Sequence, residues 1–186
     1  MEKNYQETIA SQCAQVLMDV KPSNLLILTR EEEAYFLEMQ DFPGISCLRL
    51  YEGEKKSTWF LYRADMLEST LMWPQTRQFL ETCGYHPMTD TMDSMLERLA
   101  ERFTAYKEGT MDFPHEMGIF LGYPLADVKG FIEHQGKNYL CSGYWKVYQN
   151  EHKARRTFQM YQTVKELVLH LVSEGMGLQE ISCLAY

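Results

Sequence analysis

The segment Phe113–Tyr148 constrains the fold more than any other part of the sequence, because prolines and glycines end each element after a few residues. Pro114 fits the first turn of a helix, where its missing N–H costs nothing, and Gly122 fits the position just after a helix end. Pro124 fits the start of a second helix, LADVKGFIEH, and Gly136 ends it. The two predicted helices cover residues 114–121 and 125–134.

The second of these helices has one apolar and one polar face. We expect Asp127, Lys129 and Glu133 to point into solvent. Gly130 lies inside the helix, where glycine is less favourable than alanine by about 1 kcal/mol. We therefore expect close contact between this position and another segment of backbone. The apolar face consists of Leu125, Val128, Phe131 and Ile132.

Residues 138–148 favour a β-strand, because aromatic and β-branched side chains are frequent there. Side chains alternate between the two faces of a strand, so Cys141, Gly143 and Trp145 would share one face. Both faces are largely apolar. The predicted strand is therefore a central one, covered on both sides.

The block FPHEMGIFLGYPLADVKGFIEHQGKNYLCSGYWKVY, residues 113–148, resembles the signature of the DUF3793 family, a bacterial family of unknown function. Members of this family are similar to the chain in length, and the rest of the sequence resembles them in layout. The resemblance implies an intracellular bacterial protein. It assigns no catalytic residue.

Three further segments favour strands, and two of them, joined by the polar EGEKK, form a predicted hairpin. Other segments have helical periodicity, with Asp90 and Asn150 as predicted caps of two helices. The predicted fold class is α/β (α+β), a single domain over residues 1–186 with a mixed sheet of about four strands packed by about seven helices. The predicted strands cover residues 24–29, 45–51, 57–63 and 138–148.

The net charge of −8 argues against nucleic-acid and anionic-membrane partners, because phosphate binding depends on clustered Lys and Arg. The one basic cluster, Lys153–Arg156, is predicted to be the solvated first turn of a helix, with phosphate binding as the alternative. No signal peptide and no apolar run of membrane-spanning length occur, so a cytoplasmic protein is expected. The oligomeric state is not indicated, and a protein partner stays open.

Five cysteines without a Cys-x-x-Cys pair fit neither a disulfide framework nor a zinc ribbon, so reduced thiols are expected. His115 and Glu116 begin the pattern of a zinc-protease helix, but Ile119 stands where the second histidine belongs. His115 alone could ligate haem or another metal, although a hydrogen bond at the helix start is the simpler role. No metal site and no specific cofactor are predicted.

We interpret the aromatic and polar side chains of the 113–148 segment as the wall of a ligand pocket, since its glycines leave room beside side chains that stack or donate hydrogen bonds. The alternative is a purely structural role, with Gly122 as a helix stop and Trp145 as a core side chain. The leading hypothesis is a non-catalytic cytoplasmic protein, small-ligand-binding or accessory, with its site between the helix 114–121 and the strand 138–148. The predicted ligand-binding residues are His115, Tyr123, Tyr144, Trp145 and Lys146.

The alternative is a small thiol-dependent hydrolase or transferase, in which Cys141 is the nucleophile, His115 the base and Glu116 the group that orients it. Adjacent residues on a helix point about 100° apart, so His115 and Glu116 do not align easily in series. The glycine patterns typical of nucleotide binding and of serine hydrolases do not occur. The sequence identifies neither ligand nor substrate.

Overall fold

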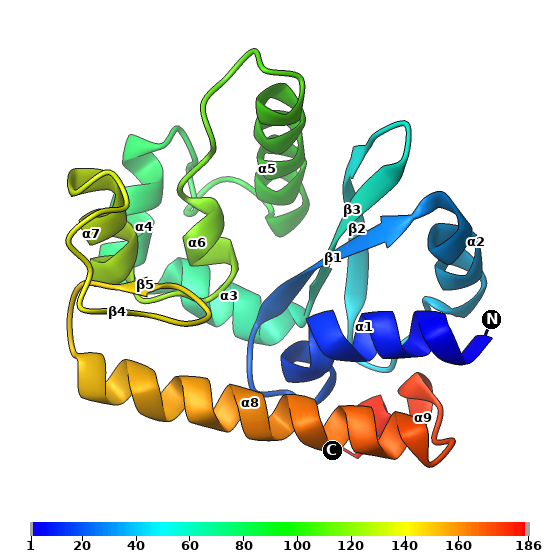
Figure 1. The fold of residues 1–186 in the computed structure, drawn as a ribbon. Helices are drawn as coiled ribbons and strands as arrows, with labels where there is room; N and C mark the ends of the chain where they lie inside the picture. The colour runs from blue at the N-terminus through cyan, green and yellow to red at the C-terminus, as the bar shows by residue number, and fades with distance from the viewer. Residues whose placement is uncertain (1, 185–186) are drawn as a thin grey trace.

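The computed structural model describes residues 2–184 and contains helices and strands in both halves of the chain (Figure 1). The helices are α1 (Glu2–Leu17), α2 (Arg30–Met39), α3 (Ala64–Met72), α4 (Pro74–Thr82), α5 (Met92–Lys107), α6 (Met117–Phe120), α7 (Leu125–Glu133), α8 (Glu151–Ser173) and α9 (Leu178–Cys183). The strands are β1 (Ser23–Thr29), β2 (Ser46–Glu52), β3 (Lys56–Tyr62), β4 (Cys141–Ser142) and β5 (Lys146–Val147). The predicted α/β fold class is confirmed.

The central strand β3 organises the core, because its side chains alternate between two hydrophobic clusters. Trp59 and Leu61 pack on one face of the sheet with side chains of α1, α2, α8 and α9. Phe60 packs on the other face with side chains of α3 to α7. The sheet thus separates two helical layers, with the 113–148 segment attached to the second.

The predicted mixed sheet of four strands is wrong. The main sheet has the order β1-β3-β2, and both of its pairs are antiparallel. Residues 138–148 form a separate two-stranded hairpin, β4 and β5, in place of one long strand. The chain reverses at Gly143, whose N–H donates to the carbonyl of Trp145, so the strand-like sequence is interrupted by its own glycine. The hairpin joining β2 and β3 was predicted correctly.

Helix ends follow the local signals with two differences. The side chain of Asn150 accepts a hydrogen bond from the N–H of Lys153 and caps α8, as predicted. Thr91 caps α5 in place of Asp90, whose carboxylate accepts the N–H of His86. The predicted helix 114–121 is shorter, because α6 contains only Met117–Phe120 and a turn precedes it. Nine helices occur in residues 2–184, against about seven expected.

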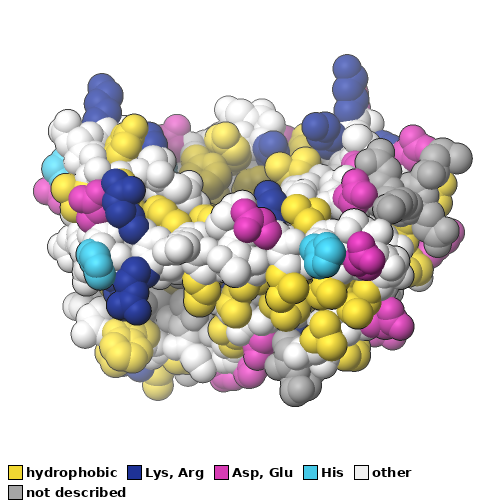
Figure 2. Space-filling model, turned by 60° about the horizontal axis from the view of Figure 1, so that its bottom comes forward, with side chains coloured by type: hydrophobic (Ala, Val, Ile, Leu, Met, Phe, Trp, Pro, Cys, Tyr) yellow, Lys and Arg dark blue, Asp and Glu magenta, His cyan; other side chains and the backbone are white. Residues whose placement is uncertain are grey.

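The long helix α8 runs below α1 and below the β4–β5 hairpin, which lies between α7 and the first turns of α8 (Figure 1). On the face that α8 helps to form, Lys and Arg side chains gather near its start and hydrophobic side chains toward its far end (Figure 2). None of the helices described in residues 2–184 has the length and apolar character needed to cross a membrane.

Candidate ligand-binding site

The corner between α6 and α7 depends on two glycines. Gly122 has φ +72°, which favours glycine, and a Cβ there would lie only 2.6 Å from Cγ of Pro22. A Cβ on Gly118 would lie 2.9 Å from a methyl group of Val128. Both positions therefore need glycine for the chain to turn sharply and for α6 to pack closely on α7.

Asp127 on α7 holds the hairpin in place. Its side chain is 3% exposed and accepts hydrogen bonds from Trp145 Nε1 (2.7 Å), from the N–H of Tyr148 (2.7 Å) and from the N–H of Gln149 (2.9 Å). The expectation that Asp127 faces solvent is wrong, because the hairpin covers this side of α7 and supplies three donors. Gly130 permits this approach, since a Cβ there would lie 2.5 Å from the side chain of Tyr148.

The hairpin has one face toward α8 and one toward α7. Cys141 pairs with Val147 across the strands, and both side chains pack with Ala154 of α8. The neighbouring pair, Ser142 and Lys146, projects to the opposite face because side chains alternate along a strand.

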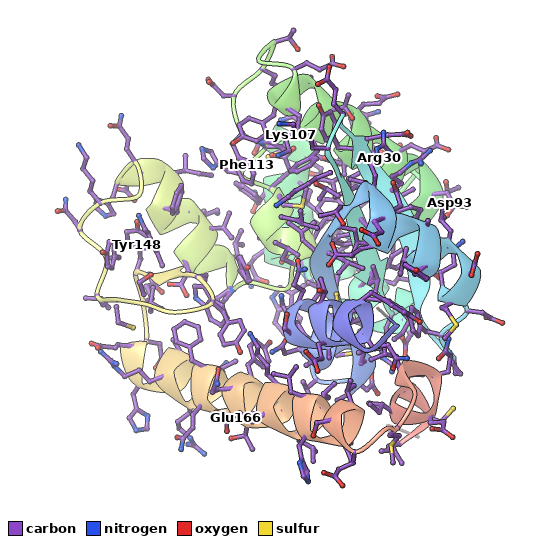
Figure 3. The ribbon with its side chains drawn as sticks, turned by 45° about the vertical axis from the view of Figure 1, so that its right-hand side comes forward. Arg30, Asp93, Lys107, Phe113, Tyr148 and Glu166 are labelled. Atoms are coloured by element: carbon purple, nitrogen blue, oxygen red, sulfur yellow. The ribbon has the colours of Figure 1, made fainter. Side chains whose placement is uncertain are left out.

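A cavity of about 330 Å³ lies between α6, α7 and the β4–β5 hairpin. Its wall is mostly apolar and aromatic, with a few polar groups. The His115 ring lies between Phe113 and Phe131, at centroid distances of 5.6 and 5.4 Å. Phe113 lies on the segment before α6 and Tyr148 follows the hairpin, with α7 between them in the view of Figure 3. The lining residues are Phe113, His115, Met117, Gly118, Leu121, Tyr123, Asp127, Val128, Phe131, Ser142, Gly143, Trp145 and Lys146.

The ammonium group of Lys146 is the cationic group of this wall. Its Nζ donates to the carbonyl of Gly136 (2.8 Å) and lies 5.0 Å from the ring centre of Tyr139 and 5.6 Å from that of Phe131. These contacts orient the side chain along aromatic surface. In the described part of the chain, no carboxylate forms an ion pair with it.

A second ammonium group lies behind the wall. Lys21 is 3% exposed, and its Nζ lies 5.2 Å from the ring centre of Tyr123. Burial lowers the pKa of Lys21 to about 8 and raises the pKa of Tyr123 to about 12. Both shifts arise because a charged group loses hydration inside the protein. Among the side chains that the structure describes, no carboxylate pairs with Lys21.

Four of the five predicted ligand-binding residues line the cavity, namely His115, Tyr123, Trp145 and Lys146. The fifth, Tyr144, does not. Its hydroxyl accepts a hydrogen bond from Gln15 on α1, and its ring packs edge-on against Tyr161 of α8. Tyr144 therefore connects the hairpin to the first helical layer.

The residues of the predicted thiol site lie in three different environments. Only His115 lines the cavity. Glu116 is buried on another side of the turn, with Arg102 Nε at 2.5 Å and the Tyr85 hydroxyl at 3.3 Å. Cys141 packs against α8. Burial raises the pKa of Tyr85, and the nearby carboxylate of Glu116 adds to this shift.

Another hollow, of about 370 Å³, lies on the far side of the Trp145–Asp127 pair and extends along the start of α8. Lys153 of the predicted basic cluster lines it, whereas Arg155 forms an ion pair with Glu151 on the same helix. Trp145 and Asp127 line both hollows. No cluster of three or more His, Cys, Asp or Glu side chains suited to a metal ion occurs within the described residues.

Among the residues of the wall that were not predicted as ligand-binding are Phe113, Phe131 and Ser142. Phe131 had been assigned to the apolar face of α7, and Phe113 and Ser142 had no assigned role. Their proximity depends on the hairpin reversal, for which Gly143, followed by two aromatic residues, was the available signal. A second glycine, Gly136, with φ +71°, shapes the approach to the hairpin.

The model of a family described as "Protein of unknown function (DUF3793)" matches residues 9–182. No curated protein and no solved structure matches the chain.

Proposed function

Since the chain belongs to the DUF3793 family, whose function is unknown, we propose from the geometry of the site that it is a non-catalytic small-ligand-binding protein. The ligand occupies the cavity between α6, α7 and the β4–β5 hairpin. The observation that carries this proposal is the cavity itself, about 330 Å³ in volume and lined by aromatic side chains with few polar groups. Sites for small molecules typically have this composition and volumes of roughly 300–1,000 Å³.

The rigidity of the wall supports the proposal. Asp127 fixes the hairpin through three hydrogen bonds, and Gly130 and Gly143 allow close packing on both sides. A wall held in this way keeps its shape without a ligand, so binding loses little free energy to the ordering of side chains and loops.

Two contacts favour a binding role over thiol chemistry. Cys141 faces α8, away from the side of the hairpin that carries Ser142. The carboxylate of Glu116 forms an ion pair with Arg102. His115 thus has neither the nucleophile nor the orienting carboxylate of a thiol enzyme as an observed partner. We further propose that the protein acts in the cytoplasm, a reducing compartment, which suits the five free cysteines of residues 2–184.

A fragment screen by ligand-observed NMR tests this function. Aromatic fragments should bind the protein and should lose binding in Ser142→Trp, because an indole at this exposed position on the cavity side fills the space. Ser69→Trp is the matched control, since Ser69 is also exposed but lies on α3. Fragments that fail to bind the unmodified protein, or that bind Ser142→Trp equally well, would refute the proposal.

A further inference from the structure

The walls of the cavity favour a flat apolar ligand body. Four aromatic rings, each from a different segment, line the cavity, namely Phe113, Tyr123, Phe131 and Trp145. Such rings offer broad faces and edges for stacking. The volume lies at the small end of the range for ligand sites, which suits a body of one or two fused rings.

The carboxylate that lines the cavity, that of Asp127, already accepts hydrogen bonds from other groups of the protein. Asp127 Oδ1 accepts the N–H groups of Tyr148 and Gln149, and Oδ2 accepts the indole N–H of Trp145. A carboxylate that receives three donors is well compensated and has little left to attract a cationic ligand. The negative charge of Asp127 is therefore compensated by hydrogen bonds within the protein.

The cationic groups of the site are not compensated in the same way. Lys146 uses one of its three N–H groups for the carbonyl of Gly136 and has no carboxylate partner within the described residues. Lys21, buried behind Tyr123, adds a second positive charge near the wall. The site therefore offers an anion a favourable potential and a charge-assisted hydrogen bond.

We infer that the ligand is an organic anion with a flat apolar body, such as an aromatic carboxylate, and that Lys146 binds its acidic group while the aromatic walls bind the body. This inference rests on the proposed function, because it concerns the same cavity. His115, held between Phe113 and Phe131, adds a nitrogen donor or acceptor on the same wall.

Three probes with one aromatic body test the charge preference: naphthalene-2-carboxylate, naphthalene-2-carboxamide and naphthalen-2-ylmethylammonium. Their dissociation constants are measured by NMR titration at constant pH and low salt. The carboxylate should bind about tenfold more tightly than the amide, the size of one charge-assisted hydrogen bond, and the ammonium compound most weakly. In Lys146→Met, the preference for the carboxylate over the amide should disappear.

Two further variants separate charge from folding. Lys146→Arg keeps the positive charge and should retain the preference. Lys137→Met removes an exposed lysine that does not line the cavity and should behave like the unmodified protein. Equal affinity for carboxylate and amide, tighter binding of the ammonium compound, or an unchanged preference in Lys146→Met would overturn the inference and leave the proposed function standing. Failure of all three probes, when neutral fragments from the screen bind, would also overturn it. Failure of every fragment and probe refutes the proposed function itself.

Discussion

The indole Nε1 of Trp145 donates a 2.7 Å hydrogen bond to the buried carboxylate of Asp127. The same carboxylate accepts the N–H groups of Tyr148 and Gln149, so one side chain of α7 fixes both the turn of the hairpin and the chain that leaves it. These hydrogen bonds set the distance between α7 and the β4–β5 hairpin, and therefore the shape of the candidate site.

Replacement of Asp127 with alanine should destabilise the protein by about 3 kcal/mol, since three donors lose their partner at a buried position. Urea denaturation followed by tryptophan fluorescence measures this change. Asp112→Ala, at an exposed position, is the control and should change the free energy of unfolding by less than about 0.5 kcal/mol. Equal stability of the two variants would show that the hydrogen bonds do not hold the hairpin.

Gly130→Ala should also destabilise the protein, although alanine is the better helix former by about 1 kcal/mol. The added methyl group would lie 2.5 Å from the side chain of Tyr148, and overpacking typically costs about 1–3 kcal/mol. In a Tyr148→Gly background, which removes both Cβ and Cγ of Tyr148, the same substitution should be neutral or stabilising. A double-mutant cycle from thermal unfolding measures the coupling. No coupling between the two positions would contradict the close contact.

Lys21 makes stability depend on pH. Burial lowers its pKa from 10.5 to about 8 in the folded protein, so the unfolded chain binds more protons than the folded one between these values. The destabilisation that Lys21 causes is therefore complete below about pH 8 and fades as the pH rises toward 10.5. Relative to Lys21→Met, the unmodified protein should gain up to about 3 kcal/mol between pH 7 and pH 10, measured by urea denaturation. A constant difference over this range would refute the shift.

The five thiols should react with iodoacetamide in an order set by exposure. Cys183 is exposed and should be alkylated first. Burial raises the pKa of Cys13, which should react only on unfolding, and it raises the pKa of the half-buried Cys47 to about 12, so Cys47 should react slowly. Cys141, which faces α8, should be protected as well. Mass spectrometry of timed samples at pH 7 to 9 gives the order, and rapid alkylation of Cys141 near neutral pH would instead favour the thiol-enzyme alternative.

Local chemistry was sufficient to predict much of the scaffold. The cap at Asn150, the turn at Gly122 and the β2–β3 hairpin each depend on residues within one turn of chain, and all three were predicted. Site residues such as His115 and Lys146 could also be named, because aromatic and polar residues cluster around glycines in one segment.

The predictions that were wrong concern residues whose positions depend on contacts between distant segments of the chain. Asp127 looked like a solvent-exposed acid because its three donors come from residues that the sequence alone does not bring near it. The direction of Tyr144 is set by Gln15 on α1, at the other end of the chain. The predicted central strand failed because Gly143 allows the chain to reverse against the ring of Phe158, a contact with α8 that no local pattern encodes.

Trp145 lines two hollows, and it is held there by a hydrogen bond to Asp127 and by ring contacts with Tyr123 and Phe158. The indole therefore separates the two hollows. A smaller side chain at this position would leave Asp127 as the other residue that lines both hollows.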